Sequence, residues 1–493
     1  MIKFRSAIFL LNVLFLLCLV SSGCRANAGA VNVKSSGAKG NGIADDTEAL
    51  RKAFSSLAKT GGTIYFPAGV YITDIIDIRP DKGMSISVSG EGVRSVVKLG
   101  AKFVKPIAVF FCEIPDVKLS FNNLTVDGNY MNRTRAWKTT GPRQIEPDQQ
   151  VNAIFAYNVN SLTVSKCAIR SVHGDGIACY SATKLTANNN VIENVSGTGI
   201  KGHRVISMEA NYNQITNSGL LTDKYVLDGQ EQRFMLNGPN TKFGDGIEAE
   251  SQTLNATYNK IVNPGRCGIV HDLAQDLKFA NSRAFVSNNT ITINSLKINS
   301  NNPPAGMWFE QSANVEVIKN TVSIIKSGNK ITSAIRFFDI TESINCSNNK
   351  IQSGTYNQVS DNAIGVFEPR IKKLRITGNN ISGRFKSALA LSYENKASRV
   401  GNLIISQNTI LGNKRIDKGI SMSISGSNKF PDQTEIVSNT LVGLNSKPFD
   451  WYYYGAIAAR PAPSVIKVAG NTTDKAFSNL KLIAPKGVTI NSK

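Results

Sequence analysis

Short runs of alternating apolar and polar residues recur along most of the chain, and Val, Ile and Thr are frequent in them. Gly and Asn stand between the runs. Alternation with a period of two, bounded by turn-forming residues, is typical of half-buried β-strands. The pattern therefore predicts an all-β protein rather than a helical one.

A motif of the form Asn-x-(Ile/Leu/Val) shows that the strands belong to a repeat. From Asn289 onward its spacings are 31, 29, 30, 29 and 31 residues; earlier spacings are 23, 23 and 46. This period fits a leucine-rich repeat or a parallel β-helix. Leucine is sparse and the repeats contain no helical pattern, which favours the β-helix. The motif begins at Asn122, Asn190, Asn213, Asn259, Asn289, Asn320, Asn349, Asn379, Asn408 and Asn439, and Cys167 takes the same place once.

In a parallel β-helix each repeat is one coil of short strands, and neighbouring coils are stacked about 4.8 Å apart. We expect each Asn to bend the chain between two strands, because Asn tolerates the left-handed backbone conformation. We also expect the stacked Asn side chains to hydrogen-bond to one another along the row.

A small residue followed by an apolar one opens a strand ahead of each Asn, as in Gly176-Ile177, Gly246-Ile247 and Ala334-Ile335. Alternation places the apolar residue inward and the residues one and three positions later outward. The first outward row then runs Ala178, Lys201, Glu248, Val270, Trp308, Arg336, Gly365. The second runs Tyr180, His203, Glu250, Asp272, Glu310, Phe338.

Near the N-terminus, acidic residues at 45–48 and Gly61-Gly62 bound an expected helix at about 46–58, which would cap the open end of the solenoid. The runs Gly40–Thr47 and Gly61–Tyr71 resemble the pectate-lyase-like superfamily of right-handed parallel β-helix proteins. The resemblance implies a single-stranded right-handed parallel β-helix over residues 29–493, with the N-terminal capping helix. It also implies a carbohydrate-active protein. The superfamily includes polysaccharide lyases, polygalacturonase-like hydrolases, epimerases and phage tailspikes.

Glu250, Asp272 and Glu310 fall on consecutive coils, where carboxylates about 5 Å apart repel one another. Such a stack gains nothing structurally, so we predict that these three residues carry the chemistry. The predicted supporting residues are Asp245, Glu248 and His203. If the three carboxylates are ordinary surface charges, the alternative site lies around His173 and Asp175.

A formal net charge of +21 favours a polyanionic partner. The basic clusters are short, which argues against nucleic acid, so we expect an acidic polysaccharide (uronate or sulfated) and a monomeric protein. Charged residues make up only 18% of the chain, which excludes a disordered or coiled-coil protein. Long non-repetitive segments at about 127–150 and 218–243 are expected to form loops beside the groove. The candidate substrate-binding residues are Lys201, Trp308, Arg336, Arg135 and Trp137.

Hydrolysis by paired carboxylates is the favoured reaction and requires no cofactor. The Asn-Thr-Asp, Gly-Asp-Asp, Gly-His-Gly and Arg-Ile-Lys signatures of polygalacturonases are absent. The first alternative is a polysaccharide lyase, with Ca²⁺ held by Asp245, Glu248 and Glu250 and with Lys201, His203 or Arg336 as the base. The second is a non-catalytic glycan-binding surface protein or a uronan epimerase.

Residues 1–28 have the features of a secretory signal: Lys3 and Arg5 precede an apolar stretch, and Ala26-Asn27-Ala28 fits a cleavage site. In a rival interpretation, Cys24 is lipidated as in a bacterial lipoprotein. Cleavage after Ala28 lowers the net charge by three. No later stretch is long and apolar enough to span a membrane. We therefore expect a secreted or periplasmic protein, or an outer-surface lipoprotein, of a bacterium.

Overall fold

The structure is a computed structural model. It describes residues 30–491 except 102–106, 130–150, 220–221, 228–229, 236–243, 274–280, 296–304, 328–332, 355–359, 394–397, 426–430, 432, 455–463 and 475–487. The predicted signal at 1–28, with Cys24, lies outside the described residues, and so do Arg135 and Trp137. Among the described residues, no helix combines the length and the apolar character needed to cross a membrane.

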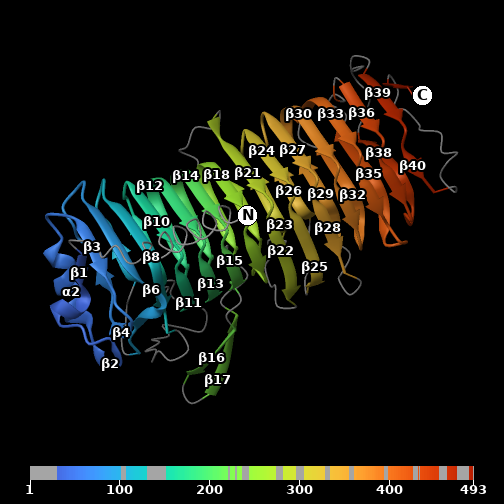
Figure 1. Ribbon diagram of the computed structural model, residues 1–493. Helices are drawn as coiled ribbons and strands as arrows, with labels where there is room; N and C mark the ends of the chain where they lie inside the picture. The colour runs from blue at the N-terminus through green and yellow to red at the C-terminus, as the bar shows by residue number, and fades with distance from the viewer. Residues whose placement is uncertain are drawn as a thin grey trace, which may run out of the picture.

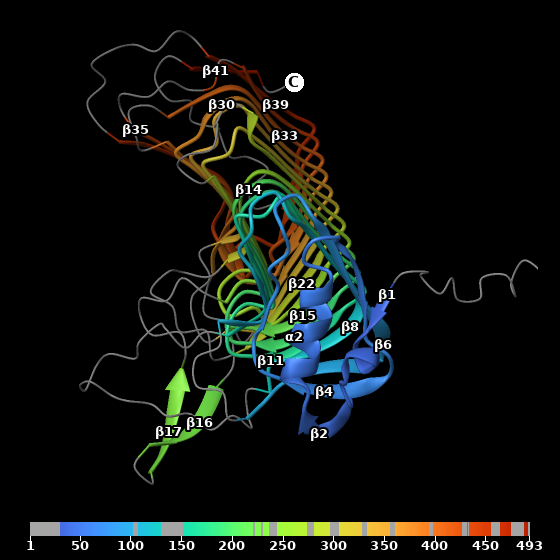
Figure 2. The ribbon, with the colours of Figure 1, turned by 90° about the vertical axis from the view of Figure 1, so that its left-hand side faces the viewer.

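The chain winds into one elongated solenoid of stacked parallel strands, shown along its length in Figure 1 and towards its N-terminal end in Figure 2. Its three faces correspond to the three strands of each coil. The all-β parallel helix predicted from the repeat is therefore confirmed. The first face contains β5 (Ile76–Asp77), β7 (Ala108–Cys112), β9 (Asn152–Tyr157), β12 (Ile177–Asn188), β14 (Ile200–Asn211), β18 (Ile247–Thr257), β20 (Ile269–Asp272), β23 (Ala305–Glu310), β26 (Ser333–Phe338), β29 (Ser360–Phe367), β32 (Phe385–Tyr393), β35 (Ile416–Ser425) and β38 (Lys447–Tyr454).

Long strands such as β12, β14 and β18 continue from the first face onto the second. The second face also contains β1 (Ala30–Asn32), β3 (Gly62–Tyr65), β6 (Ser85–Leu99), β8 (Lys118–Asp127), β10 (Ser161–Ser165), β21 (Arg283–Ser287), β24 (Asn314–Ile318), β27 (Ser343–Ser347), β30 (Arg370–Thr377), β33 (Arg399–Ser406), β36 (Gln433–Val437), β39 (Ser464–Ala469) and β41 (Val488–Asn491). The third face contains the ends of β6 and β8 together with β2 (Asn41–Asp45), β4 (Gly69–Thr73), β11 (Ala168–Val172), β13 (Val191–Val195), β15 (Gln214–Ser218), β19 (Lys260–Val262), β22 (Thr290–Ser295), β25 (Thr321–Ser327), β28 (Lys350–Ser353), β31 (Asn380–Ser382), β34 (Thr409–Leu411), β37 (Thr440–Val442) and β40 (Thr472–Thr473).

A buried ladder of Asn side chains runs along the corner between the second and third faces, as the repeat predicted. In each step an amide Nδ2 donates to Oδ1 of the next Asn, and the backbone N–H donates to the same oxygen. For Asn349 and Asn379 these distances are 2.9 and 3.0 Å. Nδ2 of Asn349 also donates to the carbonyl of Val317 (2.8 Å), so donors and acceptors are matched along the row. The ladder extends from Asn190 to Asn471, and the backbone N–H of Cys167 donates to its first member.

Two details of the ladder differ from the prediction. The left-handed residue is the one before each ladder Asn, for example Asn189 (φ 59°) or Tyr258 (φ 57°). Turning the chain one residue earlier leaves the ladder Asn free to point inward along the axis. Asn122 is not a member, because it is exposed and pairs in register with Ser165, which places Leu124 at the ladder position.

The predicted inward row on the first face is confirmed. Ile177, Ile200, Ile247 and Ile269 pair in register on successive strands, and all are fully buried. The small residue before each of them is required by the closeness of the coils. A Cβ added at Gly246 would lie 2.5 Å from the carbonyl oxygen of Gly268 on the next coil. This continuous apolar interior gives a rigid base for the outward rows.

Helix α2 (Thr47–Ser56) lies at the N-terminal end of the solenoid, where the cap was predicted (Figure 2). It buries Leu50 and Phe54 against the first coils. The Asp46 carboxylate accepts hydrogen bonds from the backbone N–H groups of Lys39 (2.6 Å) and Gly40 (3.0 Å). The acidic residues of the recognised motif therefore hold the cap in place.

Within the described residues from β10 onward, insertions fall at two of the three corners of the coil. From β10 onward the second-to-third corner keeps its short turn, although β6 has extra residues there between Ser89 and Val96. Residues 130–150 and 220–243 come between a third-face strand and a first-face strand. Within 218–243, β16 (Thr222–Leu227) and β17 (Gln230–Met235) form an antiparallel hairpin. The hairpin projects away from the solenoid (Figures 1 and 2). Both insertions lead directly into strands of the first face, namely β9 and β18.

Candidate active site

The two outward rows predicted on the first face are confirmed by the strand register. Lys201 pairs with Glu248, and His203 pairs with Glu250. Glu250 in turn pairs with Asp272, and Trp308 pairs with Arg336. Glu250, Asp272 and Glu310 end the first-face segments of three consecutive coils, in β18, β20 and β23. The three carboxylates therefore form the expected row.

Asp272 lies in the middle of this row, and its pKa is strongly perturbed. Burial raises the pKa of the Asp272 carboxyl to about 7, and the neighbouring charges of Glu310 and Glu250 add to the increase. The backbone N–H of Leu273 opposes it by donating to Oδ1 at 2.7 Å. A carboxyl group with this pKa is partly protonated near neutral pH, so it can act as a proton donor.

His203 and Glu250 form a close pair beside Asp272. Nδ1 of His203 lies 2.5 Å from Oε2 of Glu250, and both side chains are about one-third exposed or less, at 33% and 27%. The imidazole also contacts the ring of Tyr180, with centroids 5.0 Å apart. Burial raises the pKa of Tyr180 to about 12, so its hydroxyl stays protonated. The predicted His203 is thus oriented by a carboxylate, and Tyr180 is a neighbour that the sequence had not singled out as functional.

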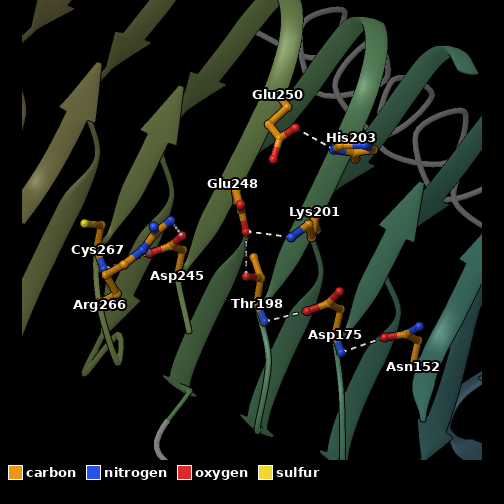
Figure 3. A network of polar contacts seen from close by, with 10 residues as sticks. All are labelled: Asn152, Asp175, Thr198, Lys201, His203, Asp245, Glu248, Glu250, Arg266 and Cys267. Atoms are coloured by element: carbon orange, nitrogen blue, oxygen red, sulfur yellow. Dashed lines mark hydrogen bonds and ion pairs between the residues drawn. The ribbon is translucent and has the colours of Figure 1, made fainter. Parts of the chain in front are cut away.

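Lys201 and Glu248 form a buried ion pair in the first row (Figure 3). Nζ of Lys201 lies 3.2 Å from Oε2 of Glu248, which also accepts a hydrogen bond from Thr198 Oγ1 at 3.1 Å. Burial alone would lower the pKa of Lys201, but Glu248 and Asp175 raise it above its ordinary value. Lys201 is therefore protonated and fixed, and it makes no general base at neutral pH.

Asp175 and Asp245 both serve the backbone at the strand entrances. Oδ1 of Asp175 accepts a hydrogen bond from the N–H of Thr198 (2.7 Å), and Oδ1 of Asp245 accepts one from Cys267 (2.9 Å). Asp245 is fully buried and forms an ion pair with Arg266, whose Nε donates to Oδ1 at 2.9 Å (Figure 3). The two Gly-Asp-Gly-Ile segments therefore hold neighbouring coils together, and these contacts do not bring Asp245 to the carboxylate row.

The set Asp245, Glu248 and Glu250 does not fit a Ca²⁺ site. Each carboxylate is engaged by a different basic residue: Arg266, Lys201 and His203, respectively. Within the described residues, no three His, Cys, Asp or Glu side chains converge as a metal site would require.

Trp308 and Arg336 lie on the side of the row that faces the C-terminus. The guanidinium carbon of Arg336 lies 4.5 Å from the Trp308 ring centroid and 5.0 Å from that of Phe367. Burial lowers the pKa of Arg336, and the charge of Glu310 opposes this shift. The indole is covered by the guanidinium on one side, so the open sugar-stacking surface expected of Trp308 is partly occupied.

His271 lies in the core directly below the carboxylate row. Its Nδ1 is 2.6 Å from Ser312 Oγ, and its Nε2 is 2.9 Å from the carbonyl of Ser251. Burial lowers the pKa of His271 to about 4, so the imidazole is neutral. Ser251 follows Glu250, and Ser312 lies two residues after Glu310. The histidine therefore links the three coils that present the carboxylates.

Several charged residues of the first face were not predicted from the sequence. The two predicted rows contain only positions that follow the inward apolar residue of each coil. Charges also occupy the strand entrances of later coils, three residues before the apolar residue. The signal was visible in Asp361-Asn362-Ala363-Ile364, Lys386-Ser387-Ala388-Leu389 and Asp417-Lys418-Gly419-Ile420.

Two protein families match the chain. Residues 30–111 match the family described as rhamnogalacturonase A/epimerase, pectate lyase-like, and residues 152–333 match the right-handed β-helix region. The resemblance inferred from the N-terminal motif is thereby confirmed. The protein has the right-handed parallel β-helix fold of the pectate-lyase-like superfamily.

Individual relatives are distant. Tailspike protein 3 of bacteriophage CBA120 has a TM-score of 0.50 at 12% identity, covering 92% of this chain and 62% of its own. The A-module of the mannuronan C-5 epimerase AlgE4 of Azotobacter vinelandii has a TM-score of 0.45 at 15% identity, covering 93% and 99%. The non-secreted LysM effector LysM19 of Penicillium expansum is 36% identical over 73 residues, which are 15% of this chain and 6% of that protein. The likeness to the tailspike shows the fold alone.

Proposed function

We propose that the protein is a polysaccharide-cleaving enzyme that hydrolyses glycosidic bonds of an acidic glycan at the carboxylate row. The observation that carries the proposal is Asp272. Its pKa is raised to about 7, between carboxylates on the two neighbouring coils, at a position that solvent reaches. Two carboxyl groups held in different protonation states are what glycoside hydrolysis requires. The match of residues 30–111 to a family named for a rhamnogalacturonase supports this class.

In this mechanism protonated Asp272 donates its proton to the oxygen of the leaving sugar. A carboxylate of the neighbouring coil, Glu250 or Glu310, either activates water or attacks the sugar directly. Both neighbours stand one coil from Asp272, a spacing of about 4.8 Å between strands. That spacing is close to the roughly 5–5.5 Å separation of retaining enzymes and shorter than the roughly 6.5–9.5 Å of inverting ones. We therefore expect the product to keep the anomeric configuration of the substrate.

The proposed substrate is a uronate or sulfated polysaccharide that lies along the first face. The net charge of +21 attracts such a chain. Arg336 lies beside Glu310 and is the predicted cation best placed to contact it, since Lys201 is already paired and buried. Arg135 and Trp137 remain proposed contacts from the insertion that leads into β9.

The decisive experiment is digestion of a panel of acidic polysaccharides by the purified protein. New reducing ends without absorbance near 230 nm, roughly the range of unsaturated uronates, would support hydrolysis, and NMR of the first product would give its anomeric configuration. An initial product of inverted configuration would exclude the neighbouring-coil pairs and favour Glu250 with Glu310. Glycan binding without any product would favour the non-catalytic alternative.

A second candidate, proton abstraction from a uronate, is favoured by the His203 arrangement. When Nδ1 of His203 donates to Glu250, Nε2 presents a lone pair, and the protonated Tyr180 hydroxyl lies on the adjacent coil. A base and an acid placed in this way serve β-elimination or epimerisation. Ultraviolet absorbance of an unsaturated product would indicate elimination. Exchange of a sugar C–H for solvent deuterium, with the chain left uncleaved, would indicate epimerisation.

We also propose that the protein is exported, on the evidence of residues 1–28. Cell fractionation with detection of the mature N-terminus would distinguish the two processing routes. Cleavage after Ala28 gives a free protein, whereas cleavage before Cys24 gives a lipid-modified one that incorporates labelled palmitate. Size-exclusion chromatography with light scattering would test the expected monomer.

A further inference from the structure

A cavity of about 420 Å³ opens on the first face, on the C-terminal side of the carboxylate row. It spans β26, β29, β32 and β35, the four coils that follow the strand of Glu310. Its lining consists of three cations, two carboxylates, an aromatic ring and two small polar side chains: Arg336, Lys386, Lys418, Asp361, Asp417, Phe367, Asn362 and Ser387. Phe367, one of the lining residues, lies in the same register row as Glu310 and Phe338, so a glycan that follows this row towards the C-terminus reaches the edge of the opening.

The ring of Phe367 forms one wall of the cavity, and Gly365 leaves the space that this ring occupies. Arg336 pairs in register with Gly365 on the next coil, and a Cβ at Gly365 would lie 2.5 Å from the ring of Phe367. The missing side chain therefore lets the Phe367 ring lie over the strand, with its centroid 5.0 Å from the Arg336 guanidinium carbon. Trp308 holds the guanidinium from the preceding coil at 4.5 Å.

Both lysines of the cavity form salt bridges, whereas Arg336 feels the charge of Glu310 without forming one among the described residues. Nζ of Lys386 lies 3.0 Å from Asp361, and Lys418 forms an ion pair with the buried Asp450. Among the described residues, no carboxylate forms a salt bridge with Arg336, and its buried Nε has no hydrogen-bond acceptor. The guanidinium plane is thus fixed by aromatic rings while donor capacity is left unused. Arginine held in this way suits a planar carboxylate or a sulfate, which accept two parallel hydrogen bonds.

We propose that this cavity is a binding subsite for one negatively charged sugar residue, whose carboxylate or sulfate ester is held by Arg336. Asp361, Asp417 and Asn362 supply acceptors and a donor for the sugar hydroxyls, and the Phe367 ring limits the position of the sugar. The inference rests on the proposed function in taking a glycan as the ligand. It adds the place at which the charged sugar binds. It also gives the direction of the substrate, which extends from the cleavage point towards the C-terminal coils.

The test is calorimetric binding of oligosaccharides to the full chain carrying Asp272→Asn, so that no substrate is consumed. Uronate, sulfated and neutral oligosaccharides of equal length form the three arms. We expect one charged class to bind roughly tenfold or more tightly than the neutral one, because only a charged sugar can form the charge-assisted bidentate hydrogen bonds with Arg336. Arg336→Met should remove that preference, and Arg336→Lys should restore only part of it. The matched control is Arg375→Met, which removes an exposed cation from the second face of neighbouring coils and should keep the preference.

The outcomes separate this inference from the proposed hydrolysis. Equal affinity for charged and neutral oligosaccharides, or full affinity in a folded Arg336→Met protein, would overturn the subsite even if the wild-type chain cleaves polysaccharide. A charge preference lost only in the Arg336 variants would establish the subsite even if no cleavage is ever seen. The arm that loses affinity identifies the anion as carboxylate or sulfate.

Discussion

Two rows of oxygen-bearing side chains run along the same axis of this solenoid, and they behave in opposite ways. The Asn ladder stacks neutral amides at one corner, each buried and each bonded to the next. The row Glu250, Asp272 and Glu310 stacks carboxylates on the first face, where burial and mutual repulsion raise the pKa of the central member. An amide both donates and accepts, whereas an ionised carboxylate only accepts. Repetition of one functional group therefore stabilises the first row and strains the second.

This difference indicates which row serves the fold and which is available for chemistry. A row that stabilises the coil stack needs no other explanation. A row that costs stability persists for another reason, and strained titratable groups in a groove are candidates for function. The following four predictions test the contrast.

The largest effect should come from Asp272→Asn, which keeps the shape of the side chain and removes its proton chemistry. We expect activity on the true substrate to fall by roughly 10²–10⁴ because the proton donor is lost. The wild-type rate should decline above about pH 7 as Asp272 loses its proton. Initial rates across pH 5 to 9 (roughly spanning the Asp272 pKa) for both proteins measure this effect. Full activity in the variant would show that the active site lies elsewhere on the chain.

The next effect is on stability, in the ladder. Asn349→Ala removes an amide that donates to Val317 and Asn379 and accepts from Asn320, leaving these buried partners unsatisfied. We expect a loss of about 2–4 kcal/mol in the free energy of unfolding. Urea denaturation followed by circular dichroism gives the value. A cost below 0.5 kcal/mol, the ordinary range of surface changes, would contradict the ladder's role.

The third prediction concerns the stability of the carboxylate row as a function of pH. Because the Asp272 pKa rises on folding from an ordinary 3.8 to about 7, its charged form disfavours the folded state, and this cost grows between about pH 4 and pH 7. Asp272→Asn should therefore match the wild type near pH 4 and be more stable above pH 7. The gain should be on the order of 1–3 kcal/mol after allowance for partial exposure. Equal stability at both pH values would show that the row is not strained.

The smallest effect is expected for Asn122→Ala, the matched control for the ladder variant. Asn122 carries the repeat motif but lies exposed, and its side chain accepts only from Ser165 Oγ at 3.1 Å. The change in the free energy of unfolding should stay within about 0.5 kcal/mol. A loss as large as that of Asn349→Ala would mean that the motif, rather than membership of the ladder, determines stability.

The sequence predicts the fold well because each coil of the solenoid repeats the same pattern of residues. The Asn spacings predicted the ladder, the small-apolar pairs predicted the inward row, and together they placed Glu250 beside Asp272. The contacts that perturb these groups could not be predicted in the same way. The Lys201–Glu248 pair and the Asp245–Arg266 pair depend on side-chain reach and burial, which spacing does not encode. Arg336, Lys386 and Lys418 come together across four coils only when the turns between them are known.

The ladder also tolerates changes in chain length. The amides of Asn213 and Asn259 are 46 residues apart and bond at 2.9 Å, the same distance as those of Asn349 and Asn379, which are 30 residues apart. An insertion at the corner leading into β18 therefore leaves the register of the coils unchanged. Segments that lead into the first face can be shortened, exchanged or grafted while the framework beneath them is preserved. The architecture thus separates what varies, the loops before the first face, from what stays constant from Asn190 to Asn471, the corner that keeps the coils aligned.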